Sequence, residues 1–383
     1  MLKKNMLFTP GPTMVPPEVN LAEAAPMIHH RTPQFSQIFM DVTEGMKALF
    51  ETKEADVFIL ASSGTGAMET SVVNLLSPGD KALFISVGKF GERWGELLKA
   101  YGCQGVELKA EYGRVISAKE VADALAKHPD AKALFTTQSE TSTGVVSDIE
   151  GYAALTRKTG TLLVVDTVSS LGVHPLRFDA WGVDVAVTGS QKGCMLPPGL
   201  GFIAVAPRVW KAVEQSKLPK YYFSLPAMKK AIADKTTAYT PAITLIRAAK
   251  VALDMLMAEG LENVYARHAM LAEASRAGVK ALGLKLFTKE GESNVLTAVE
   301  APEGIKIDAV IKRMRDEFGI TLTGGQGSMK GRIFRLGHMG YVNQFDILAA
   351  LGALEKALSD AGYPVKPGSA LAAAQEVFLK SKS

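Results

Sequence analysis

Two stretches near the middle of the chain decide its fold: TLLVVDTVSSLG (161–172) and VTGSQKGCMLPPGLG (187–201). The first has the pattern of a buried strand that ends in Asp166. The second has the pattern of a strand followed by Lys192 at the start of a Gly/Pro loop. A buried carboxylate is costly without a cation, and a lysine enclosed by apolar sequence has a lowered pKa. We therefore expect Asp166 and Lys192 to face one pocket.

This pairing matches what pyridoxal phosphate (PLP) requires. The aldehyde of PLP condenses with a lysine amine, and its pyridine nitrogen needs an anionic partner because the protonated ring is the electron sink. Val168 would then face the same ring. The alternatives are that Asp166 caps the segment that follows it, and that Lys192 lies on the surface, as most lysines do.

Outward from this centre, helical patterns separate short apolar runs such as VFILAS (57–62), KALFISV (81–87) and KALFTT (132–137). These runs are apolar throughout, which is typical of a mostly parallel sheet covered by helices on both faces. The fold class is therefore α/β. Small polar residues follow several of the runs, and ligands of open α/β sheets bind at the carboxyl ends of the strands.

The chain is expected to divide into three parts. Residues 1–20 contain four prolines and predict an extended arm without helix. Residues 21–260 form the large domain with the sheet. Residues 261–383 show short strands and helices, and predict a smaller α+β domain at the C-terminal end.

Composition excludes several classes of function. The chain has 383 residues, of which 47% are hydrophobic, and 43 basic residues balance 39 acidic ones without a basic block. A nucleic-acid partner is therefore not expected. No segment approaches the roughly 18 apolar residues of a membrane span, and we see no signal peptide. Two cysteines cannot build a disulfide framework or a zinc site, so we expect a cytoplasmic protein without a bound metal.

Four further elements allow two interpretations each. The turn in ASSGTGAMET (61–70) would present the N–H groups of Thr65, Gly66 and Ala67 to an anion, or it is an ordinary strand–helix turn. Phe90 either stacks on a flat cofactor or packs in the core. Thr141 either binds a phenolic oxygen or an imine, or belongs to a loop with Ser/Thr turns. Arg335 either grips a carboxylate or forms a surface ion pair.

Together these stretches resemble the class V aminotransferases of PLP fold type I, in particular the alanine–glyoxylate and serine–pyruvate (serine–glyoxylate) group. The resemblance covers essentially the whole chain. Its motifs are TPGPT (9–13), HHRTPQF (29–35), SSGTGAMET (62–70), SETSTGV (139–145), VVDTVSSLG (164–172), TGSQKGCMLPPGLG (188–201), TPAITL (240–245), and GGQG with RIFRLGHMG (324–340).

The resemblance implies a role for each matching residue. Lys192 would form the aldimine with the cofactor and move the substrate's α-proton, and Asp166 would hold the pyridinium. Phe90, where the family often has tryptophan, would cover one face of the ring and Val168 the other. Arg335 would bind the substrate carboxylate. The remaining implied contacts are Thr141 to the O3′ side of the cofactor, Thr65, Gly66, Ala67 and Gln191 to its phosphate, and Gly11 near the substrate carboxylate.

The resemblance also implies an assembly. In this family a second subunit completes the phosphate site through a segment like TTAYTPA (236–242). Thr236, Tyr239 and Thr240 would then serve the partner of a homodimer, with the active sites shared between the two subunits.

The implied reaction moves an amino group from alanine or serine to a 2-oxo acid, glyoxylate or pyruvate. An aspartate or aminoethylphosphonate transaminase is the nearest alternative, with Arg31 as a second arginine. A desulfurase needs a mobile cysteine, and TLTGGQGSMKGR (321–332) has none. A non-catalytic, hydrogenase-associated subunit is the third alternative, although the set of Asp166, Lys192 and Arg335 is complete.

Overall fold

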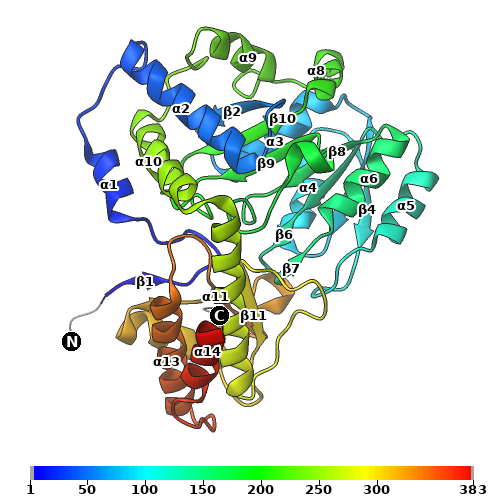
Figure 1. The fold of residues 1–383 in the computed structure, drawn as a ribbon. Helices are drawn as coiled ribbons and strands as arrows, with labels where there is room; N and C mark the ends of the chain where they lie inside the picture. Colours follow the sequence, from blue (N-terminus) through cyan, green and yellow to red (C-terminus); the bar gives the residue numbers. More distant parts are fainter. Residues whose placement is uncertain (1–3, 381–383) are drawn as a thin grey trace.

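A central sheet organises the larger part of the molecule (Figure 1). The computed structural model describes residues 4–380, so the ends of the predicted arm and C-terminal domain, 1–3 and 381–383, lie outside the described residues. Within that range seven strands form the sheet, in the order β2 (Asp56–Leu60), β10 (Gly201–Val205), β9 (Val185–Gly189), β8 (Leu162–Asp166), β5 (Ala133–Thr137), β3 (Lys81–Ser86) and β4 (Gln104–Lys109). Strand β10 runs antiparallel to both of its neighbours, and the other pairs are parallel.

Helices cover both faces of this sheet. One group packs its apolar side chains on one face: α2 (Pro33–Phe50), α5 (Ala118–Lys127), α6 (Ile149–Thr159) and α10 (Ile243–Glu259). The other group packs on the opposite face: α3 (Gly64–Leu75), α4 (Lys89–Ala100), α8 (Trp210–Gln215) and α9 (Leu225–Ala233). The short helix α7 (Phe178–Trp181) adds Phe178 to the first group's core. This sandwich confirms the predicted α/β fold class.

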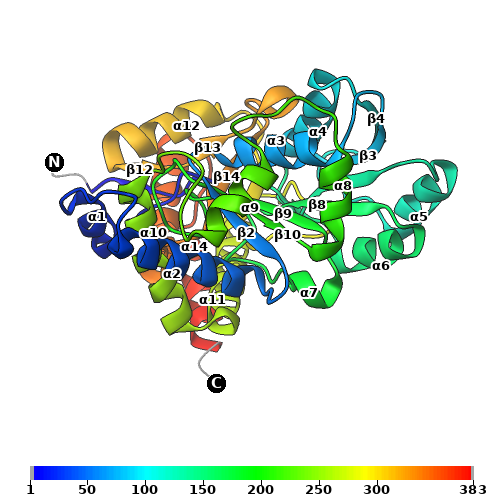
Figure 2. The same ribbon diagram turned by 90° about the horizontal axis from the view of Figure 1, so that it is seen from above.

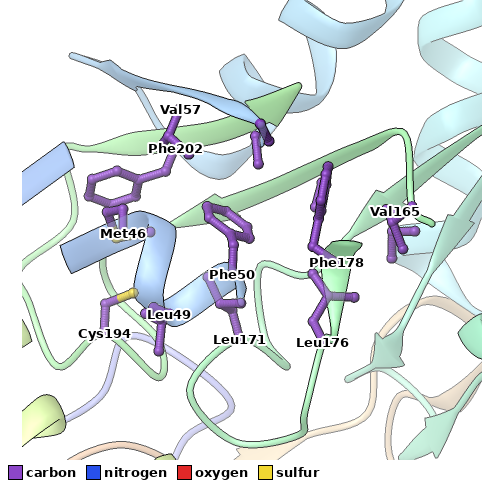
Figure 3. Packing of buried hydrophobic residues seen from close by; sticks show 14 of the residues in the cluster. Met46, Leu49, Phe50, Val57, Val165, Leu171, Leu176, Phe178, Cys194 and Phe202 are labelled. Atoms are coloured by element: carbon purple, nitrogen blue, oxygen red, sulfur yellow. The ribbon is translucent and has the colours of Figure 1, made fainter. Parts of the chain in front are cut away.

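Helix α2 shows how the sequence builds this core. Thr32 caps it by accepting the N–H of Phe35, and its apolar residues at helical spacing are buried. Figure 3 shows Met46, Leu49 and Phe50 of this helix facing side chains from the strands and from the loop that carries Cys194. Cys194 lies two residues after Lys192, so burial of its side chain anchors the loop of Lys192 to the core.

The C-terminal part has its own core around a three-stranded sheet, β11-β14-β13. Helix α11 (Leu261–Ala281) joins the two parts, because Val264 packs in the first core and Leu271 in the second. The division into 21–260 and 261–383 stays a prediction. After α11, the strands and helices of this part are β11 (Leu296–Glu300), α12 (Ile307–Arg313), a π-helical turn (Met314–Phe318), β12 (Ile320–Thr321), β13 (Thr323–Gly324), β14 (Ile333–Gly337), α13 (Gln344–Asp360) and α14 (Ser369–Lys380).

The N-terminal segment crosses from one part to the other. Strand β1 (Met6–Leu7) pairs with β12, and Phe8 is fully buried in the second core. The prediction that residues 1–20 contain no helix was wrong at its end, because helix α1 (Pro17–Ala24) begins at Pro17. Proline is tolerated at the first helical position, where its missing N–H would have no partner. Figure 2 shows α1 and α5 at opposite ends of the molecule.

Candidate active site

The carboxyl ends of the parallel strands and the N-terminal segment enclose a cavity of about 250 Å³. The two strands quoted first supply its centre, since Asp166 ends β8 and Lys192 follows β9. The cavity is lined by Gly11, Pro12, Ser63, Gly64, Thr65, Met68, Phe90, Arg93, Ser139, Asp166, Val168, Ser169, Gln191, Lys192 and Pro198. Segments up to 187 residues apart in the sequence thus meet at the sheet edge where a ligand was expected.

Lys192 is held in a fixed position inside this cavity. Its side chain is 8% exposed, and Nζ donates to the carbonyl of Pro10 and, over 3.3 Å, to Oγ of Ser169. Ser190 fixes the loop by donating to the carbonyl of Pro197 and accepting the N–H of Leu200. Lys192 is therefore placed by hydrogen bonds to its amine and by the shape of the loop that follows it.

Burial lowers the pKa of Lys192 to about 8, an effect that Asp166 opposes and that Arg335 and Arg93 increase. A substantial fraction of the amine is therefore neutral near physiological pH. The neutral form is the one that attacks an aldehyde and accepts a proton. This confirms the predicted direction of the pKa shift.

Gly11 allows the lysine to lie against the N-terminal segment. Its φ is +115°, which side chains rarely adopt, and a Cβ built there would lie 2.7 Å from Nζ of Lys192 and closer still to its side-chain carbons. Glycine is the residue that leaves this space free.

Asp166 is 3% exposed, and its Oδ1 accepts the N–H of Val168 at 2.8 Å. Oδ2 accepts a long hydrogen bond of 3.4 Å from Thr137. Burial raises the pKa of Asp166 to about 6, against the bond from Val168. Within residues 4–380 this carboxylate forms no direct ion pair, so it is available to a cationic group in the cavity.

Phe90 lines the cavity at the start of α4, where a buried carboxylate fixes its backbone. Glu140 is fully buried and accepts the N–H groups of Phe90 and Gly91, each at 2.9 Å. Its other oxygen accepts the N–H and the hydroxyl of Ser142. Burial raises the pKa of Glu140, and the four hydrogen bonds oppose that effect. Glu140 belongs to β6 (Ser139–Glu140), which pairs with β7 (Val145–Val146).

The start of α3 forms the other end of the cavity. The first N–H groups of a helix have no partner within it, and here they belong to Gly64, Thr65 and Gly66. The N–H of Ala67 already donates to the carbonyl of Ser63, so Ala67 is placed behind this end rather than among the lining residues. Gly66 also lies outside the lining, although its N–H belongs to the same turn.

Not every predicted site residue lies in this cavity. Thr141 and Arg335 are buried beside it: Arg335 donates to the carbonyl of Thr141 at 2.8 Å and twice to that of Gly324. Burial lowers the pKa of Arg335 to about 10, and Glu140 opposes that shift. The alternative of a surface ion pair for Arg335 is wrong, because its side chain is 3% exposed.

The three residues predicted to serve a partner subunit lie elsewhere on this chain. Tyr239 and Thr240 line a small cavity at the end of β2, and the ring of Tyr239 stacks on that of Tyr222 at 5.3 Å. The hydroxyl of Thr236 accepts a hydrogen bond from Arg31 at 2.9 Å. Arg31 is thereby held at the surface and does not line the cavity around Lys192.

The residues of the site that were not singled out from the sequence include Arg93, Ser139, Glu140 and Ser169. Ser169 could have been found from the pattern, since it lies three residues after Asp166. Arg93 gave no such signal, because basic residues on amphipathic helices are usually solvent-exposed.

The described residues contain neither a metal site nor a membrane segment. No group of three His, Cys, Asp or Glu side chains within 4–380 is arranged to hold a metal ion. Over the same range no helix combines the length and apolar character needed to cross a bilayer.

The residues present fit PLP. The cavity offers an amine with a lowered pKa and a buried carboxylate that forms no salt bridge within residues 4–380. Oε1 of Gln191 is buried without a hydrogen-bond partner, so this amide has bonding capacity left for a ligand. A Cβ on Gly64 would lie 2.6 Å from Val168, so glycine keeps the turn open beside the cavity.

Comparison with known proteins identifies the same family. The model of the family described as Aminotransferase class-V matches residues 6–342. The chain is 44% identical to the soluble hydrogenase small subunit of Synechococcus sp., over 99% of both chains. It is 40% identical to the serine–glyoxylate aminotransferase of Hyphomicrobium methylovorum, over 98% of this chain and 95% of that one. It is 38% identical to the L-aspartate–glyoxylate aminotransferase of Paracoccus denitrificans, over 100% and 98%.

Solved structures agree with this result. The pyridoxamine–pyruvate aminotransferase of Mesorhizobium loti is 30% identical and superposes with a TM-score of 0.94 over 100% of this chain and 98% of that one. The alanine–glyoxylate aminotransferase of Nostoc sp. is 31% identical, with a TM-score of 0.90 over 94% and 96%. The resemblance found in the motifs is confirmed: the chain belongs to the class V aminotransferases, enzymes that carry PLP and transfer amino groups.

Proposed function

We propose that this enzyme transfers the amino group of alanine or serine to glyoxylate or pyruvate. The observation that carries the proposal is the cavity in which Lys192 and Asp166 meet with shifted pKa values. A perturbed acid and base in one cleft are typical of a catalytic site.

Asp166 and Lys192 have different roles in the proposed reaction. PLP, when bound, supplies an electron sink for the electrons of the broken Cα–H bond. The carboxylate of Asp166 would keep the pyridine nitrogen of a bound PLP protonated, because a buried anion favours the cationic form of its neighbour. Nζ of Lys192 would take the α-proton of the donor and deliver it to the former aldehyde carbon of the cofactor in the same half of the reaction, and it would move a proton in the reverse direction in the second half. The carbonyl of Pro10 and the hydroxyl of Ser169 hold this amine in place.

The substrate carboxylate is assigned to Arg335. Its guanidinium has donors beyond the bonds to Gly324 and Thr141, and a planar fork suits a carboxylate. The second arginine proposed for a dicarboxylate donor, Arg31, already binds Thr236 and the carbonyl of Thr237. This arrangement favours small monocarboxylate donors. The 40% identity to a serine–glyoxylate aminotransferase supports the same choice.

Aspartate is the second candidate donor, and one specific observation favours it: an L-aspartate–glyoxylate aminotransferase is 38% identical over the whole of this chain. Both of these relatives are named for glyoxylate, which supports glyoxylate as the acceptor. The relative named as a hydrogenase subunit supports a third possibility, a role in a larger complex. The pocket in which Lys192 and Asp166 meet, with Arg335 buried beside it, supports catalysis instead.

A homodimer with shared sites is part of this proposal. Tyr221 is 80% exposed, and its ring lies 5.7 Å from that of Tyr239 in the segment assigned to the partner's phosphate site. Exposed aromatic clusters are common at interfaces. Light scattering during gel filtration tests this directly: a dimer mass is expected, and a monomer at micromolar concentration with full activity would overturn it.

A donor screen tests the reaction. Purified enzyme with PLP is given alanine, serine, aspartate or aminoethylphosphonate, with glyoxylate or pyruvate as acceptor, and the amino acid formed is measured. Alanine or serine with glyoxylate is expected to give the highest kcat/KM. Turnover with aspartate or aminoethylphosphonate alone would overturn the proposed substrate class. Absence of turnover with all four donors would favour the non-catalytic role.

A further inference from the structure

One charged side chain of the cavity has no role in the chemistry described so far. Among the residues that line the cavity, the charged ones are Asp166, Lys192 and Arg93. The first two are committed to the ring and the aldehyde of the cofactor. Arg93 belongs to α4, three residues after Phe90, and therefore lies one helical turn from the residue expected to cover the ring.

The contacts of Arg93 direct it toward the start of α3. Its Nη1 donates to Oγ1 of Thr65 at 3.3 Å, and Cζ lies 4.9 Å above the ring of Phe90. Thr65 belongs to the first turn of α3, whose N–H groups have no partner within the helix, and Gly64 and Thr65 of this turn line the cavity. The guanidinium therefore borders the same end of the cavity as these N–H groups.

Arg93 also has no anionic partner among residues 4–380, unlike the neighbouring Lys89. Its neighbour Lys89 is paired with Glu92 at 2.5 Å, and Glu92 also accepts the hydroxyl of Tyr112. Within residues 4–380, Arg93 forms no salt bridge. One of the five N–H donors of an arginine is used by Thr65, so most of the fork remains free.

We propose that Arg93 binds the phosphate of PLP from within the same subunit, together with Thr65 and the first N–H groups of α3. A phosphate carries close to two negative charges, and the N–H dipoles of one helix end balance only about half a charge. An arginine fork supplies a full charge and two parallel hydrogen bonds. The proposal rests on PLP as the cofactor and does not depend on which amino acid is the donor.

The test compares PLP with pyridoxal, which has the same ring and aldehyde but no phosphate. Kd values for both are measured on the full-length apoenzyme by the absorbance change of the bound aldehyde. The preference for PLP is the ratio of the two Kd values. In Arg93→Gln the preference is expected to fall about tenfold or more, since bonds to charged groups contribute that much, while the Kd of pyridoxal stays within about twofold.

Two controls make the result specific. Arg332→Gln removes an exposed arginine of the C-terminal part and is expected to leave both Kd values unchanged. Arg93→Lys keeps the charge without the fork and is expected to fall between the wild type and Arg93→Gln. Circular dichroism verifies that each variant is folded, and inorganic phosphate should compete with PLP more weakly in Arg93→Gln than in the wild type.

Two outcomes would overturn the proposal. An equal loss of PLP and pyridoxal affinity would mean that Arg93 only positions Phe90. An unchanged preference for PLP with a raised donor KM would place Arg93 at the substrate carboxylate. The Kd values of PLP and pyridoxal are measured without an amino donor, so failure of the proposed reaction would leave the measured preference for PLP standing.

Discussion

The carboxylate of Glu140 accepts the backbone N–H of Phe90 at 2.9 Å, which ties a residue that lines the cavity to a fully buried acid. Glu140→Gln would turn an amide donor toward N–H or O–H groups that are donors themselves. We expect a loss of roughly 2 kcal/mol in the unfolding free energy of the apoenzyme and weaker PLP binding. Chemical denaturation and PLP titration measure both. Unchanged values in both assays would show that Glu140 does not hold the turn of Phe90.

Gly11 and Lys192 give a second prediction, because a Cβ at position 11 would collide with the lysine side chain. Gly11→Ala is expected to slow PLP incorporation and to lower kcat. Gly79→Ala is the matched control, since Gly79 also has a positive φ, +83°, but no atom lies within 4 Å of its added Cβ. The positive φ should cost both variants about 1–2 kcal/mol of stability, and Gly11→Ala should lose more because its Cβ also collides with Lys192. Equal cofactor binding in the two variants would contradict the role assigned to Gly11.

The lowered pKa of Lys192 predicts a pH dependence of stability. In the unfolded chain this lysine has the ordinary pKa of 10.5, and in the folded apoenzyme it is about 8. Between these values the unfolded chain binds more protons, so the stability of the apoenzyme rises with pH across that window and this contribution is constant below it. The slope approaches about 1.4 kcal/mol per pH unit.

Lys192→Met isolates this contribution. The difference in unfolding free energy between wild type and variant, measured by urea denaturation from pH 7 to pH 10.5, should change in favour of the wild type as the pH rises. A difference that is independent of pH would mean that Lys192 titrates normally in the folded protein.

The role proposed for Arg335 predicts that its substitution weakens binding of the amino donor but not of PLP. Arg335→Lys keeps a charge near the carbonyls of Gly324 and Thr141 but removes the fork, so the KM of the amino donor should rise at least tenfold. The Kd of PLP should stay close to that of the wild type. Arg332→Lys, on the same strand region but exposed, serves as the control. An unchanged donor KM in Arg335→Lys would place the carboxylate clamp elsewhere.

The sequence predicted the centre of the site because its signals are local and physical. An aspartate that ends an apolar strand and a lysine after the next strand must both lie at the carboxyl edge of a parallel sheet. Similar reasoning on the Gly-rich turn located Thr65, and the resemblance to the family located Gln191; both residues line the cavity. The fold class followed from apolar runs that alternate with helical patterns.

What the sequence did not predict depends on distances across the fold. Whether the N–H of Ala67 can reach a ligand depends on where α3 begins. Because α3 begins at Gly64, the N–H of Ala67 donates to the carbonyl of Ser63 instead. Arg93 resembles any basic residue of a surface helix until the approach of α4 to Thr65 is known. The helix at Pro17 was missed because proline stops a helix in its interior but is favoured at its first position.

The most direct test is borohydride reduction of the enzyme with PLP, followed by proteolysis and mass spectrometry. A single pyridoxyl-modified peptide is expected, modified at Lys192, and Lys192→Arg should leave no modified peptide. A modification on another lysine, or an unchanged level in Lys192→Arg, would contradict the assignment of Lys192 and Asp166 as the centre of the active site.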